Sequence, residues 1–195
     1  GQIFFGGREL GQFRRREFAR LVALLPQTRD VPAIRAEQLV AHGRYPHLSF
    51  GRDLTQADRE KIRWAMEVTG TTALQNKELS QLSGGQRVYL AMTLSQDTDI
   101  LFLDEPTTYL DIGQKYEMLE LIARVNALGK TVVMVLHDLS LAFSYSHQVV
   151  VLEQGKIAAQ GEAQPVFDSG VPARVFGVSS QCITLDGRKE YLFLP

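Results

Sequence analysis

The sequence predicts an α/β fold, in which a parallel sheet flanked by helices carries a helical insertion. In the second half of the chain apolar strands alternate with helices, as in strand Ile100–Leu103, helix Gln114–Leu128 and strand Thr131–Leu136. Continuous runs of β-branched residues and leucine, such as the last of these, are typical of strands covered on both faces and hence of a parallel sheet. Residues 28–90 are mostly helical in pattern, so we expect them to form an insertion into the α/β core.

The remaining elements follow from local signals. Thr55 and Asp58 form a capping pair, and Gly70 can end the helix that they begin, which we expect to reach Thr69. The other expected elements are a strand at Ile3–Phe5 that turns at Gly6-Gly7, a short basic helix at Phe13–Arg20, a strand at Leu21–Leu25, helices at Glu37–His42 and Leu139–Ser144, a strand at Gln148–Leu152 and a helical piece around Gln164–Asp168.

Composition places the chain among ordinary globular proteins. It has 195 residues, 45% of them apolar and 22% charged, with a formal net charge of −1. That balance gives no electrostatic reason to expect a nucleic-acid partner. The longest apolar runs, Val132–Leu136 and Val149–Leu152, are far too short to cross a bilayer. A single cysteine, Cys182, excludes an intrachain disulfide framework and is expected to be a packed strand residue in a soluble, intracellular protein.

Two carboxylates stand at the end of a predicted buried strand. The run Ile100–Leu103 is followed directly by Asp104 and Glu105, at the edge of the sheet where open α/β folds bind ligands. A carboxylate at such a position can hold a metal ion, and its neighbour can act as a general base. The alternative is a strand that simply ends in a solvated acidic turn.

A glycine-rich segment lies between the helical region and that strand. In Leu82-Ser83-Gly84-Gly85-Gln86, Ser83 is a good helix N-cap and the two glycines allow backbone N–H groups to approach an anion closely. The dipole of the following helix favours the same ligand, so the segment can grip a terminal phosphate. The alternative is an ordinary helix cap. A chance match to both this segment and the Asp-Glu strand is much rarer than either alone.

Three further residues follow predicted strands or precede helices in a suggestive order. Gln27 follows the strand Leu21–Leu25, where a neutral amide can reach a metal ion or a water molecule. Asp111 lies in the loop that caps the next helix. His137 directly follows the strand Thr131–Leu136, where it can contact a terminal phosphate. Each is a weak signal by itself, and a structural residue is the alternative in each case.

Taken together, these segments resemble the nucleotide-binding subunits of ABC transporters over essentially the whole chain. Gln27, Leu82–Gln86, Ile100–Pro106, Asp111 and His137 match the Q-loop, signature, Walker B, D-loop and H-loop in order. The resemblance implies a P-loop NTPase (RecA-like) core that binds ATP and Mg²⁺. It assigns Asp104 and Gln27 to the metal, Glu105, His137 and Gln27 to catalysis, and Ser83, Gly84, Gly85, Gln86 and Asp111 to the nucleotide.

A narrower resemblance points to one branch of that family. Gly43-Arg44-Tyr45-Pro46-His47 and the run Asp104–Ile112 are similar to the ATPases of importers for ferric siderophores, haem and cobalamin. That branch implies a dimer with a second ATPase subunit, peripheral on the cytoplasmic face of the cell membrane. The helical subdomain, 28–90, would engage the permease, with Gln27 as its hinge. Residues 1–27 and 91–165 would form the ATPase core and 166–195 a C-terminal extension.

The sequence departs from the family pattern at the phosphate loop. No Gly-x-x-x-x-Gly-Lys-Ser/Thr is present, and the only Gly-Lys-Thr, Gly129-Lys130-Thr131, has a predicted helix before it and a strand after it, the reverse of a phosphate loop. In the family this loop lies upstream of the segment resembling residues 1–10. We therefore expect an N-terminally truncated chain that lacks about 40 residues by family length, binds ATP weakly and hydrolyses it at background rate.

A second departure follows the signature. Family members continue as Gln-Arg-Gln-Arg before the apolar part of the helix, whereas Gln86-Arg87 runs directly into Val88. Removing two residues turns the remainder of a helix by about 200°. Either the core absorbs this change or the signature presents Ser83 differently.

Two other functions stay open. A non-transport ABC ATPase acting in translation or DNA repair would usually show tandem cassettes or long coiled-coil insertions, and this sequence has neither. A non-catalytic module that completes or regulates a partner ATPase is favoured by the missing phosphate loop. The transported substrate is not encoded here, because the binding protein and the permease select it.

Overall fold

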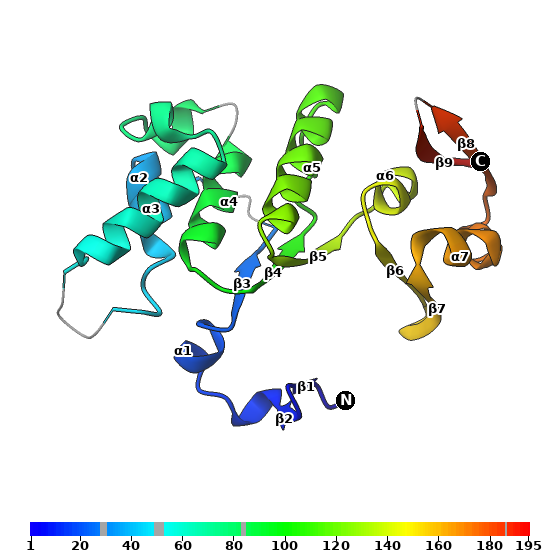
Figure 1. The fold of residues 1–195 in the computed structure, drawn as a ribbon, viewed down its shortest axis with the longest axis horizontal. Helices are drawn as coiled ribbons and strands as arrows, with labels where there is room; N and C mark the ends of the chain where they lie inside the picture. Colours follow the sequence, from blue (N-terminus) through cyan, green and yellow to red (C-terminus); the bar gives the residue numbers. More distant parts are fainter. Residues whose placement is uncertain (28–30, 49–52, 83–84, 186) are drawn as a thin grey trace. The chain divides into compact units, whose positions relative to one another are not determined.

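A computed structural model describes residues 1–27, 31–48, 53–82, 85–185 and 187–195 of the chain. These residues form two compact units, Gly1–Val135 and Leu136–Pro195, which we describe separately (Figure 1). None of the helices within the described ranges is long and apolar enough to span a membrane.

The first unit is built on a parallel sheet of β3 (Val22–Leu25), β4 (Ile100–Asp104) and β5 (Thr131–Val135). The strand order is β3-β4-β5, and both pairings are parallel. In this register Leu25 lies opposite Leu103, one residue before the end of β4. The predicted parallel α/β arrangement is therefore confirmed, and the ends of β3 and β4 meet at one edge of the sheet.

Only one face of this sheet is covered by the helices of the unit. Leu25, Leu101 and Leu103 are buried in the main core, whereas Leu24, Phe102 and Val133 are exposed by 57%, 41% and 43%. The helices of the first unit thus cover one face of the sheet, and the expectation that the strand predicted at Thr131–Leu136 is covered on both faces remains a prediction. The side chains alternate along each strand, and the helices pack against one set of them.

Helices from distant parts of the sequence lie on the buried face. α4 (Gly85–Ser95) packs against β3 and α5 (Ile112–Ala127) against β5, while α2 (Ala36–His42) and α3 (Gln56–Val68) pack against α4. The predicted capping pair is confirmed, since the Thr55 hydroxyl accepts from the Asp58 N–H and Asp58 accepts from the Thr55 N–H at 2.9 Å. Gly70, with a φ of +67°, follows the end of α3 as expected.

The start of the first unit is a small substructure beside the sheet. It contains β1 (Phe4–Phe5), β2 (Arg8–Glu9) and the single-turn helix α1 (Arg15–Phe18). The two strands pair antiparallel across the Gly6-Gly7 turn, as predicted. The described part of the unit also has short 3₁₀ turns at Leu10–Gln12, Thr72–Leu74 and Leu79–Gln81.

The second unit contains two antiparallel strand pairs and three short helices. In chain order these are α6 (Leu139–Ser144), β6 (Gln148–Glu153), β7 (Lys156–Glu162), α7 (Ala163–Asp168), α8 (Val171–Phe176), β8 (Ser179–Leu185) and β9 (Arg188–Leu194). Helix α8 was not predicted; Gly170 precedes it with φ +68°, and Pro172 lies in its first turn. Cys182 is a half-buried residue of β8, packed as expected.

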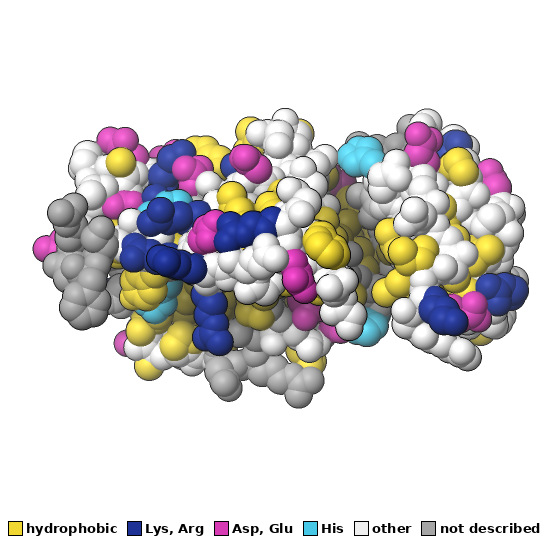
Figure 2. Space-filling view, turned by 90° about the horizontal axis from the view of Figure 1, so that it is seen from below, with side chains coloured by type: hydrophobic (Ala, Val, Ile, Leu, Met, Phe, Trp, Pro, Cys, Tyr) yellow, Lys and Arg dark blue, Asp and Glu magenta, His cyan; other side chains and the backbone are white. Residues whose placement is uncertain are grey.

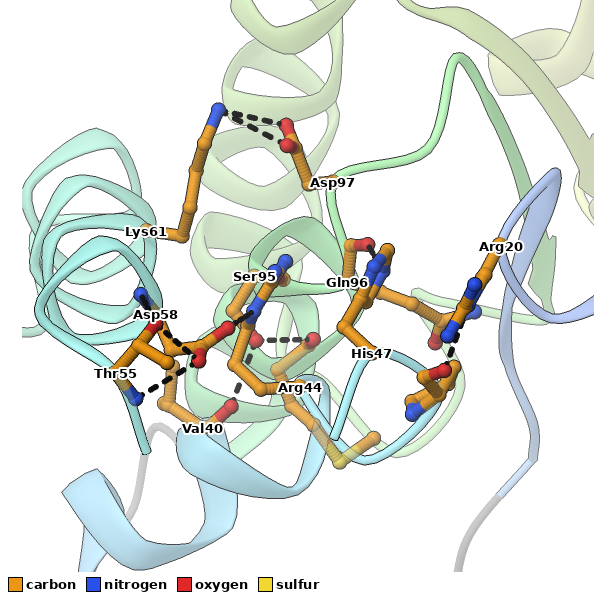
Figure 3. Close-up of polar contacts among 12 residues, drawn as sticks. Arg20, Val40, Arg44, His47, Thr55, Asp58, Lys61, Ser95, Gln96 and Asp97 are labelled. Carbon is orange, nitrogen blue, oxygen red and sulfur yellow. Dashed lines mark hydrogen bonds and ion pairs between the residues drawn. The ribbon is translucent and has the colours of Figure 1, made fainter. Parts of the chain in front are cut away.

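A buried ion pair ties the helices of the first unit together (Figure 3). The Arg44 Nε donates to the Asp58 carboxylate at 2.9 Å, and another Arg44 nitrogen donates to the backbone oxygen of Ser95 at 2.8 Å. Both charged side chains are only 8% exposed. A loop after α2, the N-terminus of α3 and the C-terminus of α4 therefore share one polar cluster.

Gly43 is the residue that lets this loop approach α4 so closely. A Cβ at this position would lie 2.2 Å from the Met92 backbone oxygen and 2.2 Å from the Ser95 hydroxyl oxygen. Any side chain here must push two helices apart, because one of the two neighbours is backbone.

We predict that Gly43→Ala destabilises the first unit by at least about 2 kcal/mol, the scale of an overpacked core. Urea unfolding measures this effect. Gly113→Ala is the matched control, since its Cβ would meet only the Asp111 carboxylate at 3.5 Å, an ordinary contact. The account of this loop is contradicted if the two variants unfold at the same urea concentration.

The ion pair also makes stability depend on pH. Burial opposes ionisation of Asp58, but hydrogen bonds from Thr55 and Arg44 outweigh it and lower its pKa from 3.8 to about 2. A lowered folded-state pKa stabilises the fold above the ordinary value and loses this contribution as the pH falls towards 2.

We predict that about 2 kcal/mol of stability disappears between pH 5 and pH 2 through this group. In Asp58→Asn this part of the pH dependence is absent, while the protein is less stable at pH 6 because Arg44 is left buried without its partner. Urea unfolding across the pH range provides the measurement. Asp53→Asn, at an exposed position, should keep the wild-type profile.

Candidate functional site

Glu105 lies immediately beyond β4, at the edge of the sheet where the sequence predicted a general base. Its N–H donates to the Val135 backbone oxygen at 3.2 Å, which extends the β4–β5 pairing by one residue. Its φ is +51°, a left-handed value that is uncommon for a residue with a side chain. The chain therefore leaves the sheet abruptly here, as often occurs where a side chain must be presented at a functional site.

The Glu105 carboxylate is held by donors from two different segments. The Gln27 side-chain amide donates to its Oε2 at 2.5 Å, and the Thr108 hydroxyl donates to the same oxygen at 2.9 Å. Gln27 reaches it because β3 ends beside β4. The structure thus brings together two of the residues predicted for catalysis, Gln27 and Glu105.

A small hollow lies around these side chains. Its volume is about 10 Å³, close to what a single water molecule occupies. It is lined by Leu25, Pro26, Gln27, Gln86, Asp104, Glu105, Pro106, Thr108 and Tyr109. The predicted metal ligand Asp104 therefore borders the same space as Gln27 and Glu105.

The donor set suits Mg²⁺ bound together with a phosphate. Mg²⁺ prefers oxygen ligands and is usually held by one or two carboxylates, waters and the phosphates of the substrate. Asp104 supplies a carboxylate. The side-chain amide of Gln27, whose nitrogen donates to Glu105, also has an oxygen that can bind a metal ion. Within the described ranges no group of three or more His, Cys, Asp or Glu is arranged to hold a metal ion without a substrate.

The predicted signature segment is only partly described. Ser83 and Gly84 lie outside the described residues, whereas Gly85 begins α4 and Gln86 lines the hollow beside Glu105. Helix α4 buries most of its apolar residues, which are Val88, Tyr89, Leu90, Ala91 and Leu94. The core side of α4 is thus well packed, and the shortening expected after the signature remains a prediction.

Asp111 and His137 have different surroundings. Asp111 is the N-cap of α5, and its carboxylate accepts from the Gln114 N–H at 2.8 Å. His137 is the second residue of the other unit and is followed by Asp138, which caps α6 by accepting from the Leu141 N–H at 3.1 Å. The nucleotide-contacting role of Asp111 and the catalytic role of His137 remain predictions.

Gly129-Lys130-Thr131 has the surroundings of a helix-to-strand connection. Gly129 follows α5 with a φ of +89°, and Thr131 begins β5. The Lys130 ammonium group lies 3.7 Å from the Asp99 carboxylate. The expectation that this tripeptide is not a phosphate loop is confirmed.

Two residues of the site were missed by sequence reasoning. Thr108 contacts Glu105 directly, and Tyr109 lines the hollow with a φ of +66°. Both belong to the run Asp104–Ile112, in which the sequence assigned roles only to Asp104, Glu105 and Asp111. A hydroxyl three residues after a carboxylate in a turn is a signal that could have pointed to Thr108.

Comparison with known proteins agrees with this geometry. The ABC transporter family model matches residues 1–108. The iron(3+)-hydroxamate import ATP-binding protein FhuC of Bacillus subtilis is 39% identical over 189 residues, which cover 94% of this chain and 70% of FhuC. The ferric enterobactin transport ATP-binding protein FepC of Escherichia coli is 37% identical, covering 95% of this chain and 69% of FepC.

A solved structure shows the same fold. An ABC transporter in an inward-facing conformation superposes with a TM-score of 0.81 at 22% identity, covering 90% of this chain and 73% of that one. The fold is that of the ABC ATPases, which are P-loop NTPases. The chain belongs to the ATP-binding subunits of ABC transporters, an ATPase family.

We predict that the Asp111 carboxylate stabilises α5 as its cap. Asp111→Ala should lower stability by about 1 kcal/mol, whereas Asp111→Asn should change it by only a few tenths, because asparagine caps helices as well as aspartate does. Thermal unfolding of the two variants measures the difference. Equal losses in both would show that the charge of Asp111, rather than its capping bond, is what the fold requires.

Proposed function

We propose that this chain is the energy-coupling subunit of an importer for an iron chelate, haem or cobalamin. Its similarity to FhuC and FepC, whose names describe import of iron(3+)-hydroxamate and transport of ferric enterobactin, supports this substrate class. The segment Gly43–His47 resembles the same branch. On this proposal the chain pairs with a second ATPase subunit and, through residues 28–90, docks on a membrane permease at the cytoplasmic face.

The observation that supports ATP hydrolysis most directly is the arrangement of Gln27 and Thr108 around Glu105. Two donors on one carboxylate oxygen fix the direction of the side chain, with Asp104 beside it at the end of β4. A carboxylate oriented in this way is placed to take a proton from an attacking water molecule. Asp104 and the Gln27 amide oxygen would hold Mg²⁺, which supplies charge neutralisation for the phosphates when bound.

The 195 residues contribute only part of an ATP site. They supply the general base and the ligands of the metal ion. They contain no Gly-x-x-x-x-Gly-Lys-Ser/Thr motif, whose lysine and loop N–H groups bind the phosphates. On this proposal the chain by itself binds ATP weakly and turns it over at background rate. Ser83, Gly84 and Gly85 would face the nucleotide of a partner subunit.

We predict that the chain gains Mg²⁺-dependent ATPase activity when it is fused behind the phosphate-loop segment of FhuC. In that fusion Glu105→Gln should lower kcat by at least about a hundredfold, the effect of removing a general base. Steady-state phosphate release is the measurement. Glu67→Gln, which makes the same change at an exposed position on α3, should leave kcat unchanged.

Two results would overturn the assignment. Turnover of the unfused chain at the rate of the fusion would show that its own residues bind the phosphates. A fusion in which Glu105→Gln retains full activity would show that the base lies elsewhere. A fusion that binds but never hydrolyses ATP would favour the other candidate, a module that completes a partner's site, which the lack of a phosphate loop in this sequence already suggests.

A further inference from the structure

The most basic stretch of the chain lies in and around α1 and has no role in the site described above. Arg14, Arg15, Arg16 and Arg20 fall within seven residues of a chain whose formal net charge is −1. All four side chains are exposed. Viewed from below, the first unit shows Lys and Arg side chains gathered on the side where Figure 1 draws α1 (Figure 2).

Two of these arginines converge on one backbone oxygen. The Nε of Arg16 and the Nε of Arg20 each donate to the Pro46 carbonyl oxygen at 2.8 Å. The two guanidinium groups are therefore neighbours. The distance between their Nε atoms cannot exceed the sum of these two hydrogen-bond lengths. A neutral carbonyl cannot offset two positive charges, and like charges at this separation repel each other. Their remaining N–H groups have no acceptor among the described residues.

The acceptor that gathers the two arginines is itself held firmly. The imidazole of His47, the next residue, contacts the Gln96 backbone oxygen at 2.8 Å (Figure 3). Its Nε2–H donates this bond, since a carbonyl oxygen can only accept, and burial lowers the pKa of His47. Gln96 in turn donates through its side chain to the Ala19 and Val22 backbone oxygens, at 2.5 and 3.1 Å. The fold therefore preorganises the guanidinium groups of Arg16 and Arg20.

Arg16 and Arg20 also line a hollow on the surface. Its volume is about 370 Å³, and its walls are Arg14, Arg16, Glu17, Arg20 and Leu21. Glu17 is the single acidic residue of this lining, and its carboxylate is already bound by Arg8 at 2.6 Å. The hydrogen bond from Arg8 lowers the pKa of Glu17, so the two form a neutral pair. The hollow therefore keeps a net positive charge.

We propose that Arg14, Arg16 and Arg20 form a binding site for a phosphate group. A phosphate offers several oxygens at fixed angles, which match the planar forks of neighbouring guanidinium groups better than a single carboxylate does. Its negative charge would relieve the repulsion between Arg16 and Arg20. The phosphate belongs either to the headgroup of an anionic lipid or to a free soluble phosphate. This site goes beyond the proposed function, because it needs neither ATP hydrolysis nor Glu105.

Cosedimentation with vesicles tests the lipid source. Without nucleotide, the full 195-residue chain is mixed with vesicles of phosphatidylglycerol and phosphatidylcholine, or of phosphatidylcholine alone. We expect binding only to the anionic vesicles, weakened at least about tenfold by Arg14→Gln, which leaves the Pro46 contacts intact. Arg16→Gln combined with Arg20→Gln should weaken it further. Arg15→Gln removes the same charge from the same helix outside the hollow and should weaken binding less than threefold.

Calorimetry with inorganic phosphate tests the soluble source at constant ionic strength. Binding to phosphate that Arg14→Gln abolishes and Arg15→Gln retains supports the proposal with a free phosphate as ligand. Binding to neither vesicles nor phosphate overturns it. So does an equal loss in Arg14→Gln and Arg15→Gln, which would show attraction by net charge without a site. Thermal unfolding of each variant confirms that the fold is unchanged, and Arg59→Gln on α3 is a second charge control.

Discussion

The parallel pairing of β3 with β4 is the constraint on which the candidate site depends. It places the end of β3 beside the end of β4, so that Gln27 and Glu105, which are far apart in the sequence, come within 2.5 Å of each other. A shift of this register by one residue would turn the buried side chains of β4 outwards and separate the two groups. The buried face of the sheet, through Leu25, Leu101 and Leu103, therefore fixes the geometry of the site.

The helical part of the first unit is fixed by polar contacts as much as by apolar packing. Gly43 allows a close approach to α4, and Arg44, the next residue, forms a buried ion pair with Asp58. Removing either partner would leave a buried charge, so the pair specifies how the helices meet more than it adds to net stability. Pro46 and Gln96 then connect this cluster to the segment that leads into β3. One short loop thus joins the helices to the strand that ends at Gln27.

Sequence reasoning found most of the fold because its signals were local. The capping pair at Thr55, the Gly6-Gly7 turn and the apolar strand before Asp104 each depend on a few neighbouring residues. Helix α8 was missed because glycine and proline mark loops and helix starts alike. That the helices of the first unit pack on the face opposite Phe102 and Val133 could not be predicted, because an apolar run does not reveal which face of a sheet a given helix covers. The contact of Thr108 with Glu105 depends on the left-handed backbone conformation of Glu105, and no residue pattern predicts that conformation.

The central claim is that Asp104 binds the metal ion and Glu105 takes a proton from the attacking water molecule, although the two residues are adjacent in the chain. The most direct test is the affinity of the ATP-loaded FhuC fusion for Mn²⁺ in place of Mg²⁺, measured by electron paramagnetic resonance. The account predicts that Asp104→Asn weakens Mn²⁺ binding by about tenfold or more, whereas Glu105→Gln leaves it unchanged although hydrolysis is lost. Loss of Mn²⁺ affinity in Glu105→Gln as large as in Asp104→Asn would contradict this division of roles.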